Sequence, residues 1–257
     1  MEAKDRVIVA LDVDDPEKAI GIVEQLGPYV GLFKVGLQLI YAIFAGLVAS
    51  PIEDVAVCNL RIARRLFFLL KGKLFLDGKL HDIPNTMGGS SAEVAKIEPV
   101  MFNLHASAGI EAMMAVVANK GQSLVLAVTV LTSLEENNAH LIFGGPSKAK
   151  VLQLARDAKL AGCDGIICSP QELELLGKQK ELGSLLKVTP GVRPEWAAAG
   201  DQKRIMTPAE AIKAGADYLV IGRPIINPPA EIGTPIDAAK KIAEEIATAS
   251  ATKEAKK

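Results

Sequence analysis

The chain has 257 residues, and its 29 Lys and Arg against 30 Asp and Glu give a formal net charge of −1. A hydrophobic content of 49% excludes a disordered chain, and the near-zero charge argues against nucleic-acid binding through bulk positive charge. Aromatic residues make up only 4%, so we expect an aliphatic core in one large domain, a length that α/β barrels commonly reach.

Eight short apolar runs predict strands that are covered on both faces, as in a parallel sheet. The runs cover residues 6–13, 32–37, 74–79, 100–106, 123–131, 165–169, 186–192 and 218–225. Segments with the helical spacing of apolar residues lie at 15–26, 86–97, 109–120, 147–161 and 208–214. An alternation of strand and helix that is repeated eight times predicts a single (β/α)8 TIM barrel over residues 1–257 rather than an open, doubly wound sheet.

Two segments depart from this simple alternation. Residues 39–73 are too long for one ordinary helix and contain Pro51, so we expect one helix to about residue 50 and a second to about residue 70. The end of the chain, 248–257, is rich in Ala, Thr and Lys, and we expect it to fray.

No targeting segment, membrane span or metal centre is expected. The charged start runs directly into the first strand, and the most apolar stretch, 30–51, fits a buried strand followed by a helix. The three cysteines, Cys58, Cys163 and Cys168, have neither disulfide nor zinc spacing, and we expect them to be buried. We therefore expect a cytoplasmic protein without a membrane or nucleic-acid partner.

Charged residues gather at the end of the third predicted strand. Asp77 and Lys79 are two residues apart, so on a regular strand both point to the same face, into the barrel mouth. Lys34 on the second strand and Asp82 in the next loop complete an alternating network, because buried charges need partners. The alternative is a set of ion pairs that only closes the barrel. A lysine of this network could donate a proton to a developing carbanion.

A second group of polar residues indicates a phosphate site. Gly222 and Arg223 lie in the last part of the eighth predicted strand, where a glycine lets backbone N–H groups approach an anion and an arginine binds its oxygens. The loop after the seventh strand contains Arg193 and Gln202, and barrels often bind phosphate at these two loops. The alternative is a turn with a surface arginine.

Other polar residues near strand ends are weaker candidates for a functional site. Asp12 lies at the end of the first predicted strand, and Thr132 directly follows the fifth. His81 needs only to hydrogen-bond the backbone, His105 fits a satisfied core histidine, and His140 falls in a segment that we expect to be an exposed loop.

The segment 77–86, Asp-Gly-Lys-Leu-His-Asp-Ile-Pro-Asn-Thr, resembles the signature of the orotidine 5′-monophosphate (OMP) decarboxylase family. Further motifs in the right order resemble that family at 9–12, 33–36, 128–133, 189–193, 200–204 and 221–224. The departures are 39–73, where the family usually has one shorter helix, and Gly78, where a bulkier residue is common.

The resemblance implies decarboxylation of OMP to UMP, the last step of pyrimidine nucleotide synthesis, with no metal or organic cofactor. Lys79 matches the lysine that protonates C6, and Asp77 matches the carboxylate beside the scissile group. Lys34 and Asp82 match the other members of the family's charged tetrad.

The resemblance also implies a homodimer, because Asp82 and Thr86 match residues that reach the partner subunit's site. The residues that match substrate contacts are Asp12 and Lys34 for the ribose, Thr132 for the pyrimidine, and Arg193, Gln202, Gly222 and Arg223 for the phosphate.

Two alternatives are disfavoured by the same residues. Sugar-phosphate decarboxylases and aldolase-like synthases of the same superfamily share Asp-x-Lys-x-x-Asp but bind Mg²⁺ through carboxylates, one of them at the position of Lys34, and a charged lysine is a poor metal ligand. A catalytically silent nucleotide-binding protein would have no need to keep four charged residues together.

Overall fold

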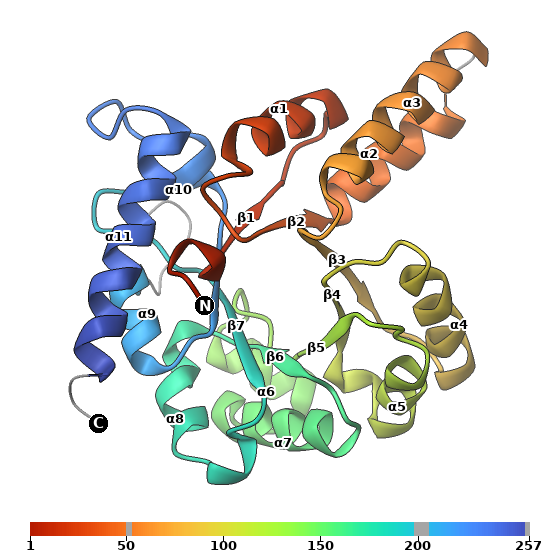
Figure 1. Ribbon diagram of the computed structural model, residues 1–257. Coiled ribbons are helices and arrows are strands. Elements are labelled where there is room, and N and C mark those ends of the chain that lie inside the picture. Colours follow the sequence, from red (N-terminus) through yellow and green to blue (C-terminus); the bar gives the residue numbers. More distant parts are fainter. Residues whose placement is uncertain (50–52, 198–205, 255–257) are drawn as a thin grey trace.

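A closed barrel of eight parallel strands, which follow one another in chain order, forms the centre of the computed structural model (Figure 1). The structure describes residues 1–49, 53–197 and 206–254. The strands are β1 (Val7–Ala10), β2 (Leu32–Gly36), β3 (Leu74–Leu80), β4 (Met101–His105), β5 (Leu124–Val128), β6 (Gly165–Ile167), β7 (Leu186–Pro190) and β8 (Tyr218–Ile221). Pairing of β8 with β1 closes the barrel, so the predicted (β/α)8 architecture is confirmed.

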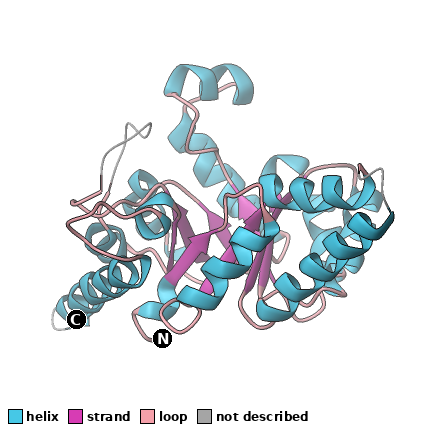
Figure 2. Cartoon of the chain, turned by 90° about the horizontal axis from the view of Figure 1, so that it is seen from above, coloured by secondary structure: helices cyan, strands magenta, loops and turns pink. Residues whose placement is uncertain are grey.

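Helices cover the outside of the barrel (Figure 2). The α-helices are α1 (Pro16–Leu26), α2 (Leu37–Val48), α3 (Glu53–Leu69), α4 (Pro84–Ala95), α5 (Ile110–Ala118), α6 (Glu136–Phe143), α7 (Ser147–Leu160), α8 (Leu173–Gly177), α9 (Pro208–Ala214), α10 (Arg223–Ile226) and α11 (Pro235–Glu254). Short 3-10 turns lie at η1 (Lys4–Arg6), η2 (Ala106–Ala108), η3 (Pro170–Glu172) and η4 (Lys180–Leu182).

Side chains along each strand alternate between two hydrophobic cores. Leu32 of β2 and Phe75 of β3 belong to the core inside the barrel, whereas Phe33 belongs to the core between strands and helices. Lys34 and Asp77 lie two residues beyond Leu32 and Phe75. The alternation therefore directs both charged side chains into the mouth of the barrel.

The long segment between β2 and β3 forms two helices, as predicted. Figure 1 shows α2 and α3 side by side, projecting away from the barrel. Asn59 of α3 donates a hydrogen bond to the carbonyl of Gly46 in α2 (2.7 Å), and Arg65 pairs with Glu24 of α1 (2.6 Å). The break expected at Pro51 lies outside the described residues.

The eighth strand is shorter than predicted. It ends at Ile221, because Gly222 leaves the extended conformation (φ −108°, ψ −98°) and α10 begins at the next residue, with Pro224 in its first turn. This change of structure places Arg223 at the start of a helix rather than within a strand.

One further prediction was wrong, and the one for the end of the chain stays a prediction. His140 is exposed as expected, but it lies in α6 rather than in a loop. The segment 248–257, which we expected to fray, is helical as far as Glu254, because the buried Ile246 and Ala249 anchor this end of α11. Residues 255–257 lie outside the described part of the chain.

The cysteines match the expectation only in part. Cys163 and Cys168 are buried, and burial raises the pKa of Cys163 to about 12, whereas Cys58 on α3 is exposed. Among the described residues, no group of three or more His, Cys, Asp or Glu is placed to hold a metal ion. None of the helices described here has the length and hydrophobicity to span a membrane.

Candidate active site

Four charged side chains form a continuous network at the barrel mouth: those of Asp12, Lys34, Asp77 and Lys79. The Nζ of Lys34 lies 3.1 Å from Oδ2 of Asp77 and 2.9 Å from Oδ1 of Asp12, and the Nζ of Lys79 lies 2.6 Å from Oδ1 of Asp77. The side chains of Asp77 and Lys34 are only 9% and 12% exposed. Limited contact with water strengthens the attraction between these charges, so the network holds cations and anions in alternation.

Neighbouring charges decide the protonation of the two most buried groups. Burial alone would raise the pKa of Asp77, but the ammonium groups of Lys34 and Lys79 outweigh it and hold that pKa below its ordinary value. Burial alone would lower the pKa of Lys34, but Asp77 and Asp12 outweigh it and raise that pKa. Both residues are therefore charged near neutral pH.

Lys79 meets Asp77 through an irregularity in β3. The register with β4 shifts between Leu76 and Leu80, and Lys79 has a φ of +50°, which is uncommon for a residue with a side chain. The predicted pairing is therefore present, but the regular strand geometry from which we predicted it was wrong. Gly78 has room for a larger side chain, since an added Cβ would meet no atom within 4 Å.

Asn103 of β4 is a site residue that the sequence analysis missed. Its Nδ2 donates a hydrogen bond to Oδ1 of Asp77 (2.6 Å), and its Oδ1 accepts one from the backbone N–H of Lys79 (2.8 Å). The residue is 1% exposed. Asn103 thus fixes both the carboxylate and the irregular backbone beside it. The available signal was a single amide in the otherwise apolar run 101–104.

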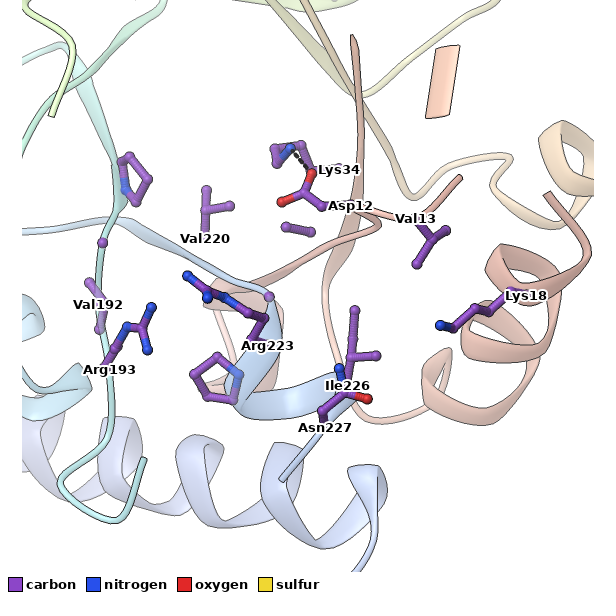
Figure 3. Close-up of a pocket in the computed structure, with 15 residues that line it drawn as sticks. Asp12, Val13, Lys18, Lys34, Val192, Arg193, Val220, Arg223, Ile226 and Asn227 are labelled. Atoms are coloured by element: carbon purple, nitrogen blue, oxygen red, sulfur yellow. Dashed lines mark hydrogen bonds and ion pairs between the residues drawn. The ribbon is translucent and has the colours of Figure 1, made fainter. Parts of the chain in front are cut away.

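A cavity of about 330 Å³ adjoins the network and is shown in Figure 3. Asp12 and Lys34 line one part of it, and Arg193 and Arg223 line another. Arg193 is buried, so its charge faces little bulk water. Gly222 also lines the cavity, where a Cβ would lie 3.4 Å from the side chain of Ala10. Two guanidinium groups in such a cavity suit the oxygens of a phosphate.

A second cavity of about 200 Å³ has Asp77 and Lys79 among its lining residues. Most of its other lining residues are apolar, and Thr132 contributes a hydroxyl group. Lys34, Pro190 and Val220 line both cavities, so the two spaces are neighbours. A flat ring in the apolar cavity could therefore be joined to a phosphate in the arginine-lined one.

Asp82 and Thr86 do not reach this network within one chain. Both are exposed, and Oδ1 of Asp82 accepts a hydrogen bond from the backbone N–H of Ile83 (2.7 Å). Among the described residues, Asp82 makes no ion pair with Lys34 or Lys79. The expectation that Asp82 belongs to this network within one chain was wrong, because the loop after β3 leaves this carboxylate in solvent.

The structure gives the surroundings of two further candidates, His81 and His105. Nε2 of His81 lies 3.1 Å from Oγ of Ser107, and its ring packs edge-on against His105, with centroids 5.5 Å apart. Burial, with His81 and Lys79 nearby, lowers the pKa of His105, which keeps this ring neutral. Gln202 lies outside the described residues.

Comparisons with known proteins agree with this geometry. Residues 5–242 match the model of the orotidine 5′-phosphate decarboxylase / HUMPS family. The chain is 43% identical over 259 residues to the orotidine 5′-phosphate decarboxylase of Heliobacterium modesticaldum, covering 96% of this chain and 98% of the relative. It is 44% identical over 253 residues to that of Geotalea daltonii, covering 95% and 97%.

A solved structure extends the likeness to three dimensions. The crystal structure of orotidine 5′-phosphate decarboxylase from Lactobacillus acidophilus has a TM-score of 0.70 and 30% sequence identity, and the match covers 93% of this chain and 98% of that one. Sequence and fold agree over nearly the whole length, and the chain therefore belongs to the orotidine 5′-phosphate decarboxylase / HUMPS family.

Proposed function

We propose that Lys34, Asp77 and Lys79 form the catalytic centre for decarboxylation of OMP to UMP, the reaction of pyrimidine biosynthesis that the family assignment gives for this chain. The observation that carries the proposal is the buried ion-pair network between an apolar cavity and an arginine-lined one. The pyrimidine occupies the apolar cavity near Thr132, and the phosphate lies against Arg193, Gly222 and Arg223. Gln202 is assigned to the phosphate by its motif alone.

Lys79 acts as the proton donor in this proposal. When the bond from C6 to the carboxyl group breaks, carbon dioxide leaves and the electron pair stays on C6. The ammonium of Lys79 transfers a proton to C6, becomes a neutral amine, and regains a proton from solvent. Because the ring offers this carbanion no electron sink, cations already in place stabilise it.

The other network residues hold the reacting groups in place. Asp77 lies beside the substrate carboxylate, and its negative charge disfavours that ground state more than the product carbon dioxide. Lys34 holds Asp77 in its charged form and, with Asp12, contacts the ribose. Binding energy from the distant phosphate keeps the carboxylate near Asp77.

The magnesium-dependent chemistry of some relatives does not suit this site. The ammonium of Lys34 lies between the carboxylates of Asp12 and Asp77, at 2.9 and 3.1 Å. A divalent cation that bridged these two carboxylates would have to displace this positive charge. The donor set therefore favours the reaction without a metal.

A homodimer completes the proposed site. Asp82 and Thr86 are exposed near the barrel mouth and are free to reach a second copy of the chain. There, Asp82 adds the fourth charge beside Lys79 of the partner subunit, and Thr86 contacts its substrate. Symmetric pairs of identical chains are the commonest oligomers.

Substitution Arg223→Ala should weaken binding of the phosphorylated substrate. Loss of a charged hydrogen bond costs about 2 kcal/mol, so we expect KM to rise roughly thirtyfold with a much smaller change in kcat. Steady-state kinetics with OMP measures both constants. Arg156→Ala, which removes an exposed arginine paired with Glu181, is the control. An unchanged kcat/KM for Arg223→Ala would contradict the phosphate role.

Substitution Asn103→Leu should lower kcat about tenfold and change the pH profile. The hydrogen bond from Asn103 lowers the pKa of Asp77, so its loss raises that pKa. Asp77 then takes up a proton at a higher pH, and the acid limb of kcat/KM moves to higher pH. Asn119→Leu, at an exposed amide, is the control. If the acid limb stays in place, Asn103 has only a structural role.

Proton delivery to C6 can be followed in heavy water. Decarboxylation of OMP in D2O should yield UMP with deuterium at C6, because the Lys79 ammonium exchanges with solvent. Proton NMR of the product detects the missing C6 proton, and incubation of UMP alone with the protein controls for exchange. Binding of UMP without any turnover of OMP would instead support the silent nucleotide-binding alternative.

A further inference from the structure

Lys18 of α1 faces the arginine-lined cavity and has no role in the site described so far. It is one of the residues that line this cavity, and Figure 3 shows its side chain extending from α1 toward Ile226 and Asn227, across the view from Arg193 and Arg223. Its side chain is exposed, and it makes no ion pair with another described residue. A cation in this position can reach an anion in the cavity.

The position of Lys18 breaks a local rule of helix structure. The N-terminal end of a helix carries partial positive charge, so a lysine in the first turn is unfavourable. Asp15 caps α1 by accepting a hydrogen bond from the N–H of Glu17 (2.8 Å), and both acidic residues suit the helix end, whereas Lys18 does not. Violations of local preference are expected at functional sites.

The charges around the cavity are unbalanced. Asp12 lines the cavity, and its carboxylate is paired with Lys34. Lys18, Arg193 and Arg223 add three positive charges from three different elements of the chain. This excess of positive charge suits a phosphate dianion.

We infer that Lys18 binds the 5′-phosphate of the nucleotide from the α1 wall and contributes to the preference for phosphorylated over unphosphorylated ligands. This inference rests on the proposed function for the identity of the nucleotide. Lys18 acts in binding and does not touch the reacting carbon. Its contact is made in substrate, product and transition state alike, so its loss raises KM and leaves kcat nearly unchanged.

The test compares phosphorylated and unphosphorylated ligands in Lys18→Met, which keeps an apolar stem and removes the charge. We expect the dissociation constant of UMP, measured by calorimetry, to rise about tenfold, and that of uridine to change less than twofold. Lys18→Arg should stay within about threefold of wild type for UMP. Lys213→Met, which removes an exposed lysine of α9 outside the cavity, is the matched control.

Two results would overturn the inference: UMP affinity within twofold of wild type in Lys18→Met, or an equal loss for uridine. Lys18→Gln repeats the measurement with a polar side chain, and circular dichroism confirms that each variant is folded. Calorimetry with UMP needs no turnover, so it tests the role of Lys18 in binding separately from the proposed decarboxylation of OMP. A wild-type protein that binds UMP through Lys18 but does not decarboxylate OMP would contradict only the proposed function.

Discussion

Substitution Lys79→Ala is expected to reduce decarboxylation of OMP by about 10⁴-fold, the upper range for loss of a general acid. The variant loses both the proposed proton donor for C6 and a cation beside the developing charge. UMP should still bind, because Arg193 and Arg223, the proposed phosphate contacts, lie in the neighbouring cavity. Single-turnover kinetics and calorimetry with UMP measure the two effects.

A second variant separates the loss of the proton donor from the loss of the positive charge. Lys79→Arg keeps a cation near Asp77, but an arginine does not give up its proton at neutral pH. We expect Lys79→Arg to be nearly as inactive as Lys79→Ala. Substantial turnover by either variant would mean that the proton comes from another group.

Mixing two inactive variants is expected to restore activity if two chains share each site. Asp82→Ala alone should lose most activity, since the partner subunit's site loses its fourth charge. In a mixed dimer of Lys79→Ala and Asp82→Ala, one site combines an intact Lys79 with an intact Asp82. Random reassortment makes half of the dimers mixed, so about one quarter of wild-type activity should return.

The control mixes Lys79→Ala with Lys34→Ala. Both residues belong to the same chain's site, so every site in the mixture carries at least one defect and activity should not return. Recovery in this control, or none in the first mixture, would contradict a site shared between subunits. Light scattering on the wild-type chain should give the mass of a dimer.

The parts of the site that sequence predicted correctly follow from a simple periodicity. Leu32 and Phe75 face the inside of the barrel, so Lys34 and Asp77, two residues further on, had to enter its mouth. A different rule located the eight strands, because continuous apolar runs suit strands covered on both faces. Both predictions required only the local pattern of apolar and charged residues in the sequence.

Other features depend on contacts that no local pattern contains. The irregular backbone at Lys79 depends on Asn103, whose amide comes from the neighbouring strand. In sequence, Asn103 is one polar residue within a buried run, and nothing nearby identifies its partners. The position of Arg223 depends on where β8 ends, and strand ends are the least reliable part of sequence-based prediction.

Asp82 shows a different limit of single-chain analysis. Its place in an alternating network was predicted from charge balance, but in one chain its carboxylate lies in solvent and accepts a hydrogen bond only from its neighbour among the described residues. If two chains share the site, as we propose, the position of Asp82 in it depends on contacts with the second chain. Its proposed role rests on the motif and on its exposure.

The most direct test of the account is decarboxylation of OMP by the purified chain in the presence of EDTA. The account predicts conversion of OMP to UMP, followed as loss of orotate absorbance, at the same rate with and without the chelator, and a loss of about 10⁴-fold in Lys79→Ala. No turnover of OMP by the wild-type chain, or turnover that EDTA abolishes and Mg²⁺ restores, would contradict it.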